Sequence, residues 1–175
     1  MTTTRGIDFT TLSLQDALDL AILIEEEAKD RYEELAGELQ LHRTPEAASF
    51  FHRMAHSEEK HRAQLAARRA VLFPHALRTV TRSMIFDVEA PEYDEARAFM
   101  SLREALQVAL RSERKAYNFF EQALPLLTDD TVKTLFGELR DEEVQHQLLV
   151  LKQLDQSPPE PLLSAEDFAD EPAPQ

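Results

Sequence analysis

The sequence predicts an all-α protein, a four-helix bundle in which two antiparallel helical hairpins are joined by a long crossover. Three observations favour this fold class. Only three glycines occur in 175 residues, and Ala, Leu and Glu, all strong helix formers, are abundant. Four stretches carry apolar residues at helical spacing. The second half of the chain repeats the pattern of the first half, so each half is expected to be one hairpin.

Helix start and stop signals delimit the four stretches. Ser13 followed by Asp16, and Ser101 followed by Glu104, have the spacing of a capping box. Thr44 and Pro45 supply an expected N-cap and a proline in the first turn. The predicted helices cover about residues 13–40, 44–70, 101–125 and 128–155.

A long segment separates the two hairpins and a short tail follows the last helix. Residues 71–100, about thirty residues, can cross the whole length of a bundle. Ala76–Ser83 is expected to form a short helix within this crossover. The bundle domain is expected to span residues 1–156. Residues 157–175 are rich in proline and acids and lack Lys and Arg, which predicts a disordered tail.

Composition excludes several functions. With 33 acidic and 19 basic residues the net charge is −14, which argues against nucleic-acid binding. The chain has no cysteine, and therefore no disulfide, Cys-ligated zinc, iron–sulfur cluster or rubredoxin-type centre. No apolar run of 18 residues and no signal-peptide pattern occurs, so we expect a cytoplasmic protein that does not enter membranes.

The internal repeat preserves polar residues at helix positions where they are not expected to persist by chance. Leu12–Ala36 aligns with Met100–Leu124 without gaps, which pairs Glu25 with Glu113, each inside an apolar stripe. In the second arm of each hairpin, Glu58-x-x-His61 recurs as Glu143-x-x-His146, whereas the neighbouring Glu59 is replaced by Val144. The repeat therefore selects Glu58 over Glu59, and likewise Glu143 over Glu142.

These positions together predict a site for two metal ions. Glu and His three residues apart lie close on one helix face. One glutamate from each of two helices and Glu-x-x-His from each of two others form the ligand set of di-iron and di-manganese carboxylate bundles. A single Glu-x-x-His is more often a solvated pair, but two symmetric copies joined by two buried glutamates favour metal. His52 and His56 are expected on the surface, and His42 and His75 in loops.

The pattern resembles the diiron domain of rubrerythrins within the ferritin-like superfamily, over Leu12 to about Leu154. The resemblance implies a ferritin-like bundle with two non-heme iron ions, for which manganese or zinc could substitute. It implies Glu58 and Glu143 as bridging ligands, with Glu25, Glu113, His61 and His146 as terminal ligands. Tyr32 would be a hydrogen-bond donor to a ligand or simply a core tyrosine, and Tyr117 is a weaker candidate for such a donor.

Two departures from that family bear on function. The rubredoxin module is missing, so electrons would come from an external donor protein. Rubrerythrins also carry a further glutamate three residues after the first ligand of the third helix, where this chain has Ala116. We expect a diiron oxidoreductase of peroxidase or ferroxidase type that reduces hydrogen peroxide or dioxygen, in a homodimer. The alternatives are a ferritin-like iron-sequestering protein and a helical interaction protein whose site holds zinc or nothing.

Overall fold

The computed structural model describes residues 7–41, 44–85, 88–91 and 100–157. Its elements are four long α-helices and two short 3₁₀-helices, with no strand in the described ranges: α1 (Leu14–Leu41), α2 (Pro45–Leu72), η1 (Arg82–Met84), α3 (Leu102–Ala123), η3 (Leu124–Leu126) and α4 (Asp130–Gln156). This confirms the predicted all-α four-helix bundle. None of the described helices is long and apolar enough to span a membrane.

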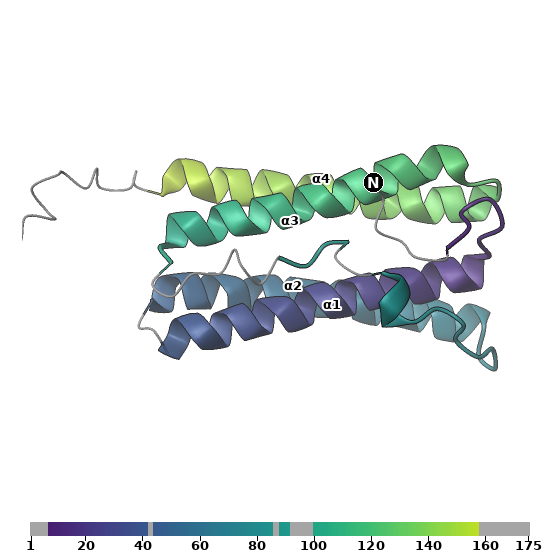
Figure 1. The fold of residues 1–175 in the computed structure, drawn as a ribbon, viewed down its shortest axis with the longest axis horizontal. Coiled ribbons are helices and arrows are strands. Elements are labelled where there is room, and N and C mark those ends of the chain that lie inside the picture. The colour runs from purple at the N-terminus through teal and green to yellow at the C-terminus, as the bar shows by residue number, and fades with distance from the viewer. Residues whose placement is uncertain (1–6, 42–43, 86–87, 92–99, 158–175) are drawn as a thin grey trace, which may run out of the picture.

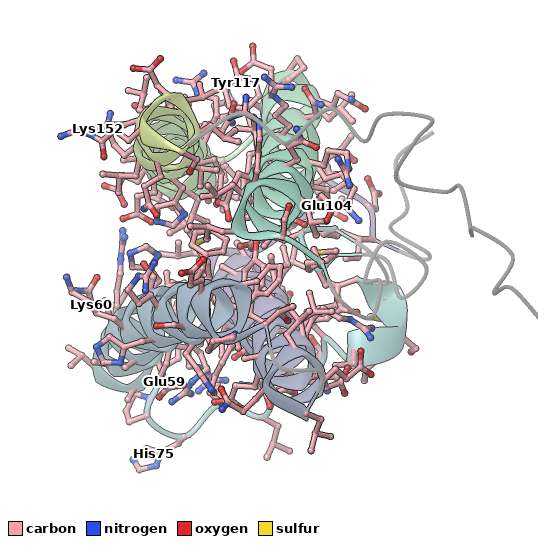
Figure 2. All side chains as sticks on the ribbon, turned by 90° about the vertical axis from the view of Figure 1, so that its left-hand side faces the viewer. Glu59, Lys60, His75, Glu104, Tyr117 and Lys152 are labelled. Atoms are coloured by element: carbon pink, nitrogen blue, oxygen red, sulfur yellow. The ribbon has the colours of Figure 1, made fainter. Side chains whose placement is uncertain are left out.

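The four helices form two antiparallel hairpins. Helix α1 packs along α2, and α3 packs along α4, and Figure 1 shows one pair lying over the other. Viewed end-on, charged side chains such as Glu59, Lys60 and Lys152 point outward from the bundle (Figure 2). The long crossover between α2 and α3 therefore connects one hairpin to the other, as the repeat predicted.

Most of the predicted helix caps are present. At α3, the Glu104 backbone N–H donates to Ser101 Oγ and the Ser101 backbone N–H donates to the Glu104 carboxylate, which completes the capping box. The Asp16 backbone N–H donates to Ser13 Oγ at 3.1 Å. Thr44 is the N-cap residue of α2 and Pro45 follows it in the first turn, as predicted, but the Thr44 side chain makes no capping hydrogen bond. Its hydroxyl and its backbone N–H both donate to the Leu39 carbonyl and so close the α1–α2 turn.

The hydrophobic core consists of two clusters along the bundle axis. One cluster joins the first half of α1 to the second half of α3 and the first half of α4, with Leu18, Phe120 and Phe136 fully buried. The other joins the second half of α1 to the first halves of α2 and α3, with Tyr32 and Phe51 fully buried. The apolar stripes predicted from the sequence thus line the interior. The four glutamates that the internal repeat pairs lie where the two clusters meet.

The crossover differs from the prediction. Ala76–Ser83 is not a helix, and only the three residues of η1 at its end are helical. Its backbone is instead held by side chains of the bundle: Arg69 donates to the carbonyls of Phe73 and Ala76 at 2.6 and 2.8 Å, and Gln15 donates to the Leu77 carbonyl at 2.8 Å. These side-chain hydrogen bonds from α1 and α2 satisfy backbone carbonyls that would otherwise accept from N–H groups within a local helix. The predicted tail lies outside the described residues from residue 158 onward.

Candidate metal centre

Each of the four long helices contributes at least one carboxylate to a buried cluster in the middle of the bundle. Glu25 on α1, Glu58 on α2, Glu113 on α3 and Glu143 on α4 are all at most 4% exposed. His146 on α4 is buried, and the His61 side chain on α2 is 16% exposed. The structure therefore brings together all six residues that the repeat selected.

The ligand atoms of these residues fall into overlapping groups at metal-binding spacing. Three groups have ligand atoms within 4.8 Å of one another: Glu58–His61–His146, Glu113–Glu143–His146 and Glu25–Glu58–Glu89. In each Glu-x-x-His pair, the imidazole Nδ1 lies 3.9 Å from a carboxylate oxygen of the glutamate one turn before it. Atoms that share a metal at about 2.1 Å lie about 3–4 Å apart. The pairs therefore fit a shared ion better than a direct hydrogen bond, which would be shorter.

The carboxylates are buried without the partners that burial of a charge requires. Both oxygens of Glu58, and one oxygen each of Glu25 and Glu143, have no hydrogen-bond partner among the described residues. Burial is the largest cause that raises the pKa of each of these three carboxyls well above its usual value, and neighbouring glutamates raise it further. A buried carboxylate is strongly unfavourable unless it is paired with a cation or coordinates a metal. Oxygen and imidazole donors without thiolates suit iron or manganese, so the residues fit the predicted metal.

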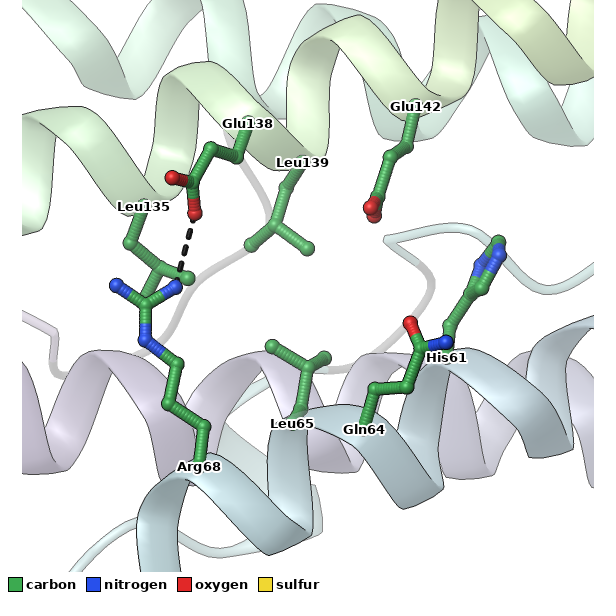
Figure 3. A pocket seen from close by; sticks show the side chains of 8 residues that line it. All are labelled: His61, Gln64, Leu65, Arg68, Leu135, Glu138, Leu139 and Glu142. Carbon is green, nitrogen blue, oxygen red and sulfur yellow. Dashed lines mark hydrogen bonds and ion pairs between the residues drawn. The ribbon is translucent and has the colours of Figure 1, made fainter. Parts of the chain in front are cut away.

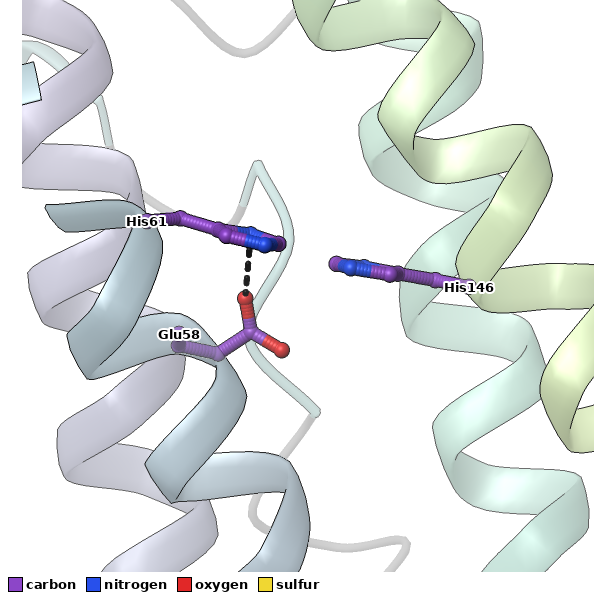
Figure 4. A group of neighbouring side chains, drawn as sticks. All are labelled: Glu58, His61 and His146. Atoms are coloured by element: carbon purple, nitrogen blue, oxygen red, sulfur yellow. Dashed lines mark ion pairs between the residues drawn. The ribbon is translucent and has the colours of Figure 1, made fainter. Parts of the chain in front are cut away.

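The two histidines face each other across the bundle. The His61 and His146 rings are stacked, with centroids 4.9 Å apart and planes 5° from parallel; Figure 4 shows them reaching from α2 and α4 toward one another above Glu58. Burial, followed by the nearby His146, lowers the pKa of His61 to about 4. At neutral pH His61 therefore has the unprotonated imidazole that a metal requires.

His146 is held by a carboxylate of the neighbouring helix. Its Nδ1 lies 3.0 Å from Glu113 Oε2. Burial alone lowers the pKa of His146, but the hydrogen bond and the negative charge of Glu113 act against it, and the pKa is raised overall. The imidazole is thereby fixed in orientation beside Glu113 and Glu143, the other two members of its group.

Tyr32, on α1, contacts the centre through Glu113, which lies on α3 of the other hairpin. Its hydroxyl donates to Glu113 Oε1 at 3.0 Å, across from α1 to α3, and its ring stacks on Phe51 with centroids 5.7 Å apart. Burial, and then the charges of Glu113 and Glu58, raise the pKa of Tyr32, so the phenol keeps its proton. The structure thus favours the hydrogen-bond donor over a purely apolar core tyrosine. Tyr117, the weaker candidate, lies on the outer side of the α3–α4 pair (Figure 2).

One further buried carboxylate belongs to the cluster and was missed by the sequence reasoning. Glu89, in the crossover, is 1% exposed, and one of its oxygens lies within 4.8 Å of one oxygen each of Glu25 and Glu58. Burial, and then the charges of Glu58 and Glu113, raise its pKa well above the usual value. No repeat partner marks it. The only available signal was a single acid between apolar neighbours in Val88–Pro91.

The residues that the repeat set aside lie away from the cluster. Glu59 is bound to Arg62 by two hydrogen bonds of 2.8 Å, and its side chain is 41% exposed. His52, His56 and His75 are exposed, as predicted. His42 lies outside the described residues. Glu142 is half-buried beside the centre but belongs to none of the ligand-spaced groups among the described residues.

A small pocket opens beside His61 between α2 and α4. It has a volume of about 130 Å³ and is lined by His61, Gln64, Leu65, Arg68, Leu135, Glu138, Leu139 and Glu142. Figure 3 shows His61 and Glu142 at one end and the Arg68–Glu138 ion pair, 2.8 Å long, at the other. The edge of the centre that carries His61 is therefore reachable through a space large enough for a few water molecules.

The fold and the cluster together define a class: ferritin-like four-helix bundles with a buried carboxylate–histidine centre. The family model described as Rubrerythrin matches residues 16–154, most of the chain, and the chain belongs to the rubrerythrin family. The resemblance inferred from the six motif residues is thereby confirmed.

Two solved structures share the fold. An uncharacterized conserved protein from Magnetospirillum magnetotacticum is 24% identical, with a TM-score of 0.68 over 86% of this chain and 99% of its own. A hypothetical protein from Pyrococcus furiosus is 20% identical, with a TM-score of 0.51 over 82% of this chain and 89% of its own. No curated protein matches the chain.

Proposed function

We propose that this protein is a non-heme diiron oxidoreductase that reduces hydrogen peroxide or dioxygen with electrons from an external donor. The observation that carries the proposal is the set of four buried glutamates and two neighbouring histidines, in which several glutamate oxygens have no hydrogen-bond partner in the described ranges. Two bound ferrous ions would supply the two electrons that, with two protons, convert hydrogen peroxide into two water molecules.

The side chains of the chain divide the work of holding and shielding such a centre. Glu58 belongs to two of the ligand-spaced groups, which supports its predicted bridging role. Glu113 is oriented from both sides, by the Tyr32 hydroxyl and by His146, so its carboxylate has little freedom to rotate. The core clusters on either side exclude bulk water from the centre along the bundle axis.

The size of the opening favours a small oxidant over an organic substrate. The pocket of about 130 Å³ beside His61 is below the usual range of about 300–1,000 Å³ for small-molecule sites. Peroxide and dioxygen are small enough to enter it. The chain lacks cysteine and therefore a thiolate-bound redox centre of its own, which supports the proposal that electrons arrive from a separate protein.

Single-turnover kinetics test the proposal. The protein is loaded anaerobically with two equivalents of Fe²⁺, mixed with peroxide or with dioxygen, and followed by stopped-flow absorbance. We expect faster oxidation than for free Fe²⁺, and a loss of at least about tenfold in Glu58→Gln or Glu143→Gln. Glu59→Gln, on the same helix but bound to Arg62, is the matched control and should behave like wild type. An unchanged rate in Glu58→Gln would refute the ligand assignment.

The same experiment separates the alternatives. Uptake of many more than two iron ions per chain, with dioxygen as the preferred oxidant, would favour iron sequestration. Less than one iron per chain after anaerobic loading would favour an interaction protein whose site holds zinc or nothing.

We also propose that the protein is a homodimer and is located in the cytoplasm. Helix α4 exposes Val144, Leu148, Leu149 and Leu151, with Leu149 59% exposed. A second copy of the chain could cover this apolar face, and native mass spectrometry decides between monomer, dimer and a larger shell.

A further inference from the structure

The crossover delivers a buried carboxylate to the candidate centre. Val88, Glu89, Ala90 and Pro91 are all buried, although the crossover residues on the α2 side, such as Leu77, are largely exposed. Lys115 of α3 donates to the Ala90 carbonyl at 2.8 Å, which fixes the chain next to Glu89 against the second hairpin. Glu89 is therefore placed by a bond to the bundle as well as by burial.

No hydrogen bond within the described part of the chain accounts for the burial of Glu89: neither of its carboxylate oxygens has a partner there, and the residue is 1% exposed. The charge of Lys115 lowers the pKa of Glu89, but burial and the neighbouring glutamates outweigh it, and the pKa is raised well above its usual value. A carboxylate in this setting is strongly destabilising unless a cation neutralises it. One oxygen of Glu89 lies within 4.8 Å of one oxygen each of Glu25 and Glu58. Among the described residues, both oxygens of Glu58 and one oxygen of Glu25 also lack a hydrogen-bond partner.

We propose that Glu89 is a seventh ligand of the metal centre and binds the ion held by Glu25 and Glu58. This inference rests on the proposed function, because it assigns a residue to the same centre. Helix α3 offers no carboxylate one turn after Glu113, since Ala116 is there and is buried in the same hydrophobic cluster as Val88. The crossover thus supplies a carboxylate ligand, Glu89, that none of the four helices provides at this position.

The assignment makes the two metal positions unequal. The group of Glu113, Glu143 and His146 contains none of the described crossover residues, whereas the group of Glu25 and Glu58 contains Glu89. Loss of Glu89 should therefore weaken one ion selectively and leave the other in place. A carboxylate that acted only through its charge would weaken both ions.

Metal binding by Glu89→Gln tests the inference without any measurement of turnover. The amide keeps the size of the side chain, and circular dichroism of the metal-free protein verifies that the variant is folded. Anaerobic titration with Co²⁺, followed by visible absorption, and with Fe²⁺, followed by metal analysis, gives the number and affinity of the sites. Glu27→Gln is the matched control, because the Glu27 charge also acts on Glu89 but Glu27 belongs to none of the ligand-spaced groups among the described residues.

The expected result is two ions in wild type and in Glu27→Gln. In Glu89→Gln one ion should bind at least about tenfold more weakly, with an altered Co²⁺ spectrum. Two ions bound with wild-type affinity and spectrum in Glu89→Gln would overturn this inference alone. An equal weakening in Glu27→Gln would also overturn it, by showing a charge effect and not ligation. Fewer than two ions in wild type would overturn the proposed function and this inference together.

Discussion

At the scale of single residues, the contact between Tyr32 and Glu113 shows how a side chain outside the ligand set can control the centre. The hydroxyl reaches Glu113 from the opposite hairpin, and the ring is fully buried against Phe51. The Glu113 carboxylate also accepts a hydrogen bond from His146 when Nδ1 of that imidazole carries the proton. Tyr32 therefore restrains a carboxylate that in turn restrains an imidazole.

Tyr32→Phe should keep the fold and disturb the centre. Phenylalanine fills the same aromatic position, so we expect a loss of about 1–2 kcal/mol in the free energy of unfolding, from the hydrogen bond alone. Iron oxidation in single turnover should slow because Glu113 is less well oriented. Urea denaturation and stopped-flow absorbance measure the two effects. Tyr117→Phe, on the outer side of α3, is the control, and equal behaviour of the two variants would contradict the role of Tyr32.

The limits of sequence reasoning are clearest at this scale. The six repeat-related residues could be predicted because each has a partner at equivalent spacing in the other hairpin, and a polar residue inside an apolar stripe is informative. The overlapping ligand-spaced groups confirm that they share one cluster, whereas their binding of metal stays a prediction. Glu89 could not be predicted, because it lies in a non-repeated segment and its position depends on long-range contacts such as Lys115 with Ala90.

At the scale of elements, the crossover depends on one arginine. Arg69 donates to both oxygens of Asp19 at 3.0 and 3.1 Å and to two crossover carbonyls. Asp19 is 1% exposed, and Arg78 is the second cation near it, at 3.5 Å. This network of hydrogen bonds explains why the predicted helix at Ala76–Ser83 does not form. The four long helices were predicted to within a few residues, because their caps and apolar spacing are local features of the sequence.

Arg69→Ala should destabilise the protein substantially. Its removal leaves the buried Asp19 with only the partly exposed Arg78, and it frees two carbonyls, so we expect a loss of about 3 kcal/mol in the free energy of unfolding. Arg68→Ala is the matched control, because Arg68 makes an exposed pair with Glu138 and should cost at most about 1 kcal/mol. Urea denaturation of both variants decides the matter. Similar losses in the two would show that the Arg69 network does not anchor the crossover.

At the scale of the whole molecule, the buried carboxyls link folding to pH and to metal. Burial raises the pKa values of Glu25, Glu58, Glu89 and Glu143 well above the ordinary glutamate value of 4.5. A raised pKa in the folded state means that the folded protein holds protons that the unfolded chain releases. The stability from these groups is full below about pH 4.5 and is lost as the pH rises through the folded pKa values.

The metal-free protein should therefore become less stable as the pH rises above about 4.5. His61, with its pKa lowered to about 4, acts in the opposite direction below about pH 6.5, because the unfolded chain then gains a proton that the folded protein lacks. Four carboxyls should outweigh this one imidazole. Urea denaturation in the presence of a chelator measures the trend. With Mn²⁺ bound, stability should instead increase with pH, since the metal competes with protons for the ligands; the same slope with and without metal would contradict the linkage.

The division of the ligands between the hairpins also bears on the ancestry of the protein. Each hairpin contributes two glutamates and one histidine, so one ancestral hairpin that paired with a copy of itself would already have presented the six-residue set. Joining two such copies in one chain would require a connecting segment, and the crossover that connects the two hairpins here contains Glu89. The crossover is then the part of the protein that could break an inherited symmetry and give two originally identical metal positions different properties.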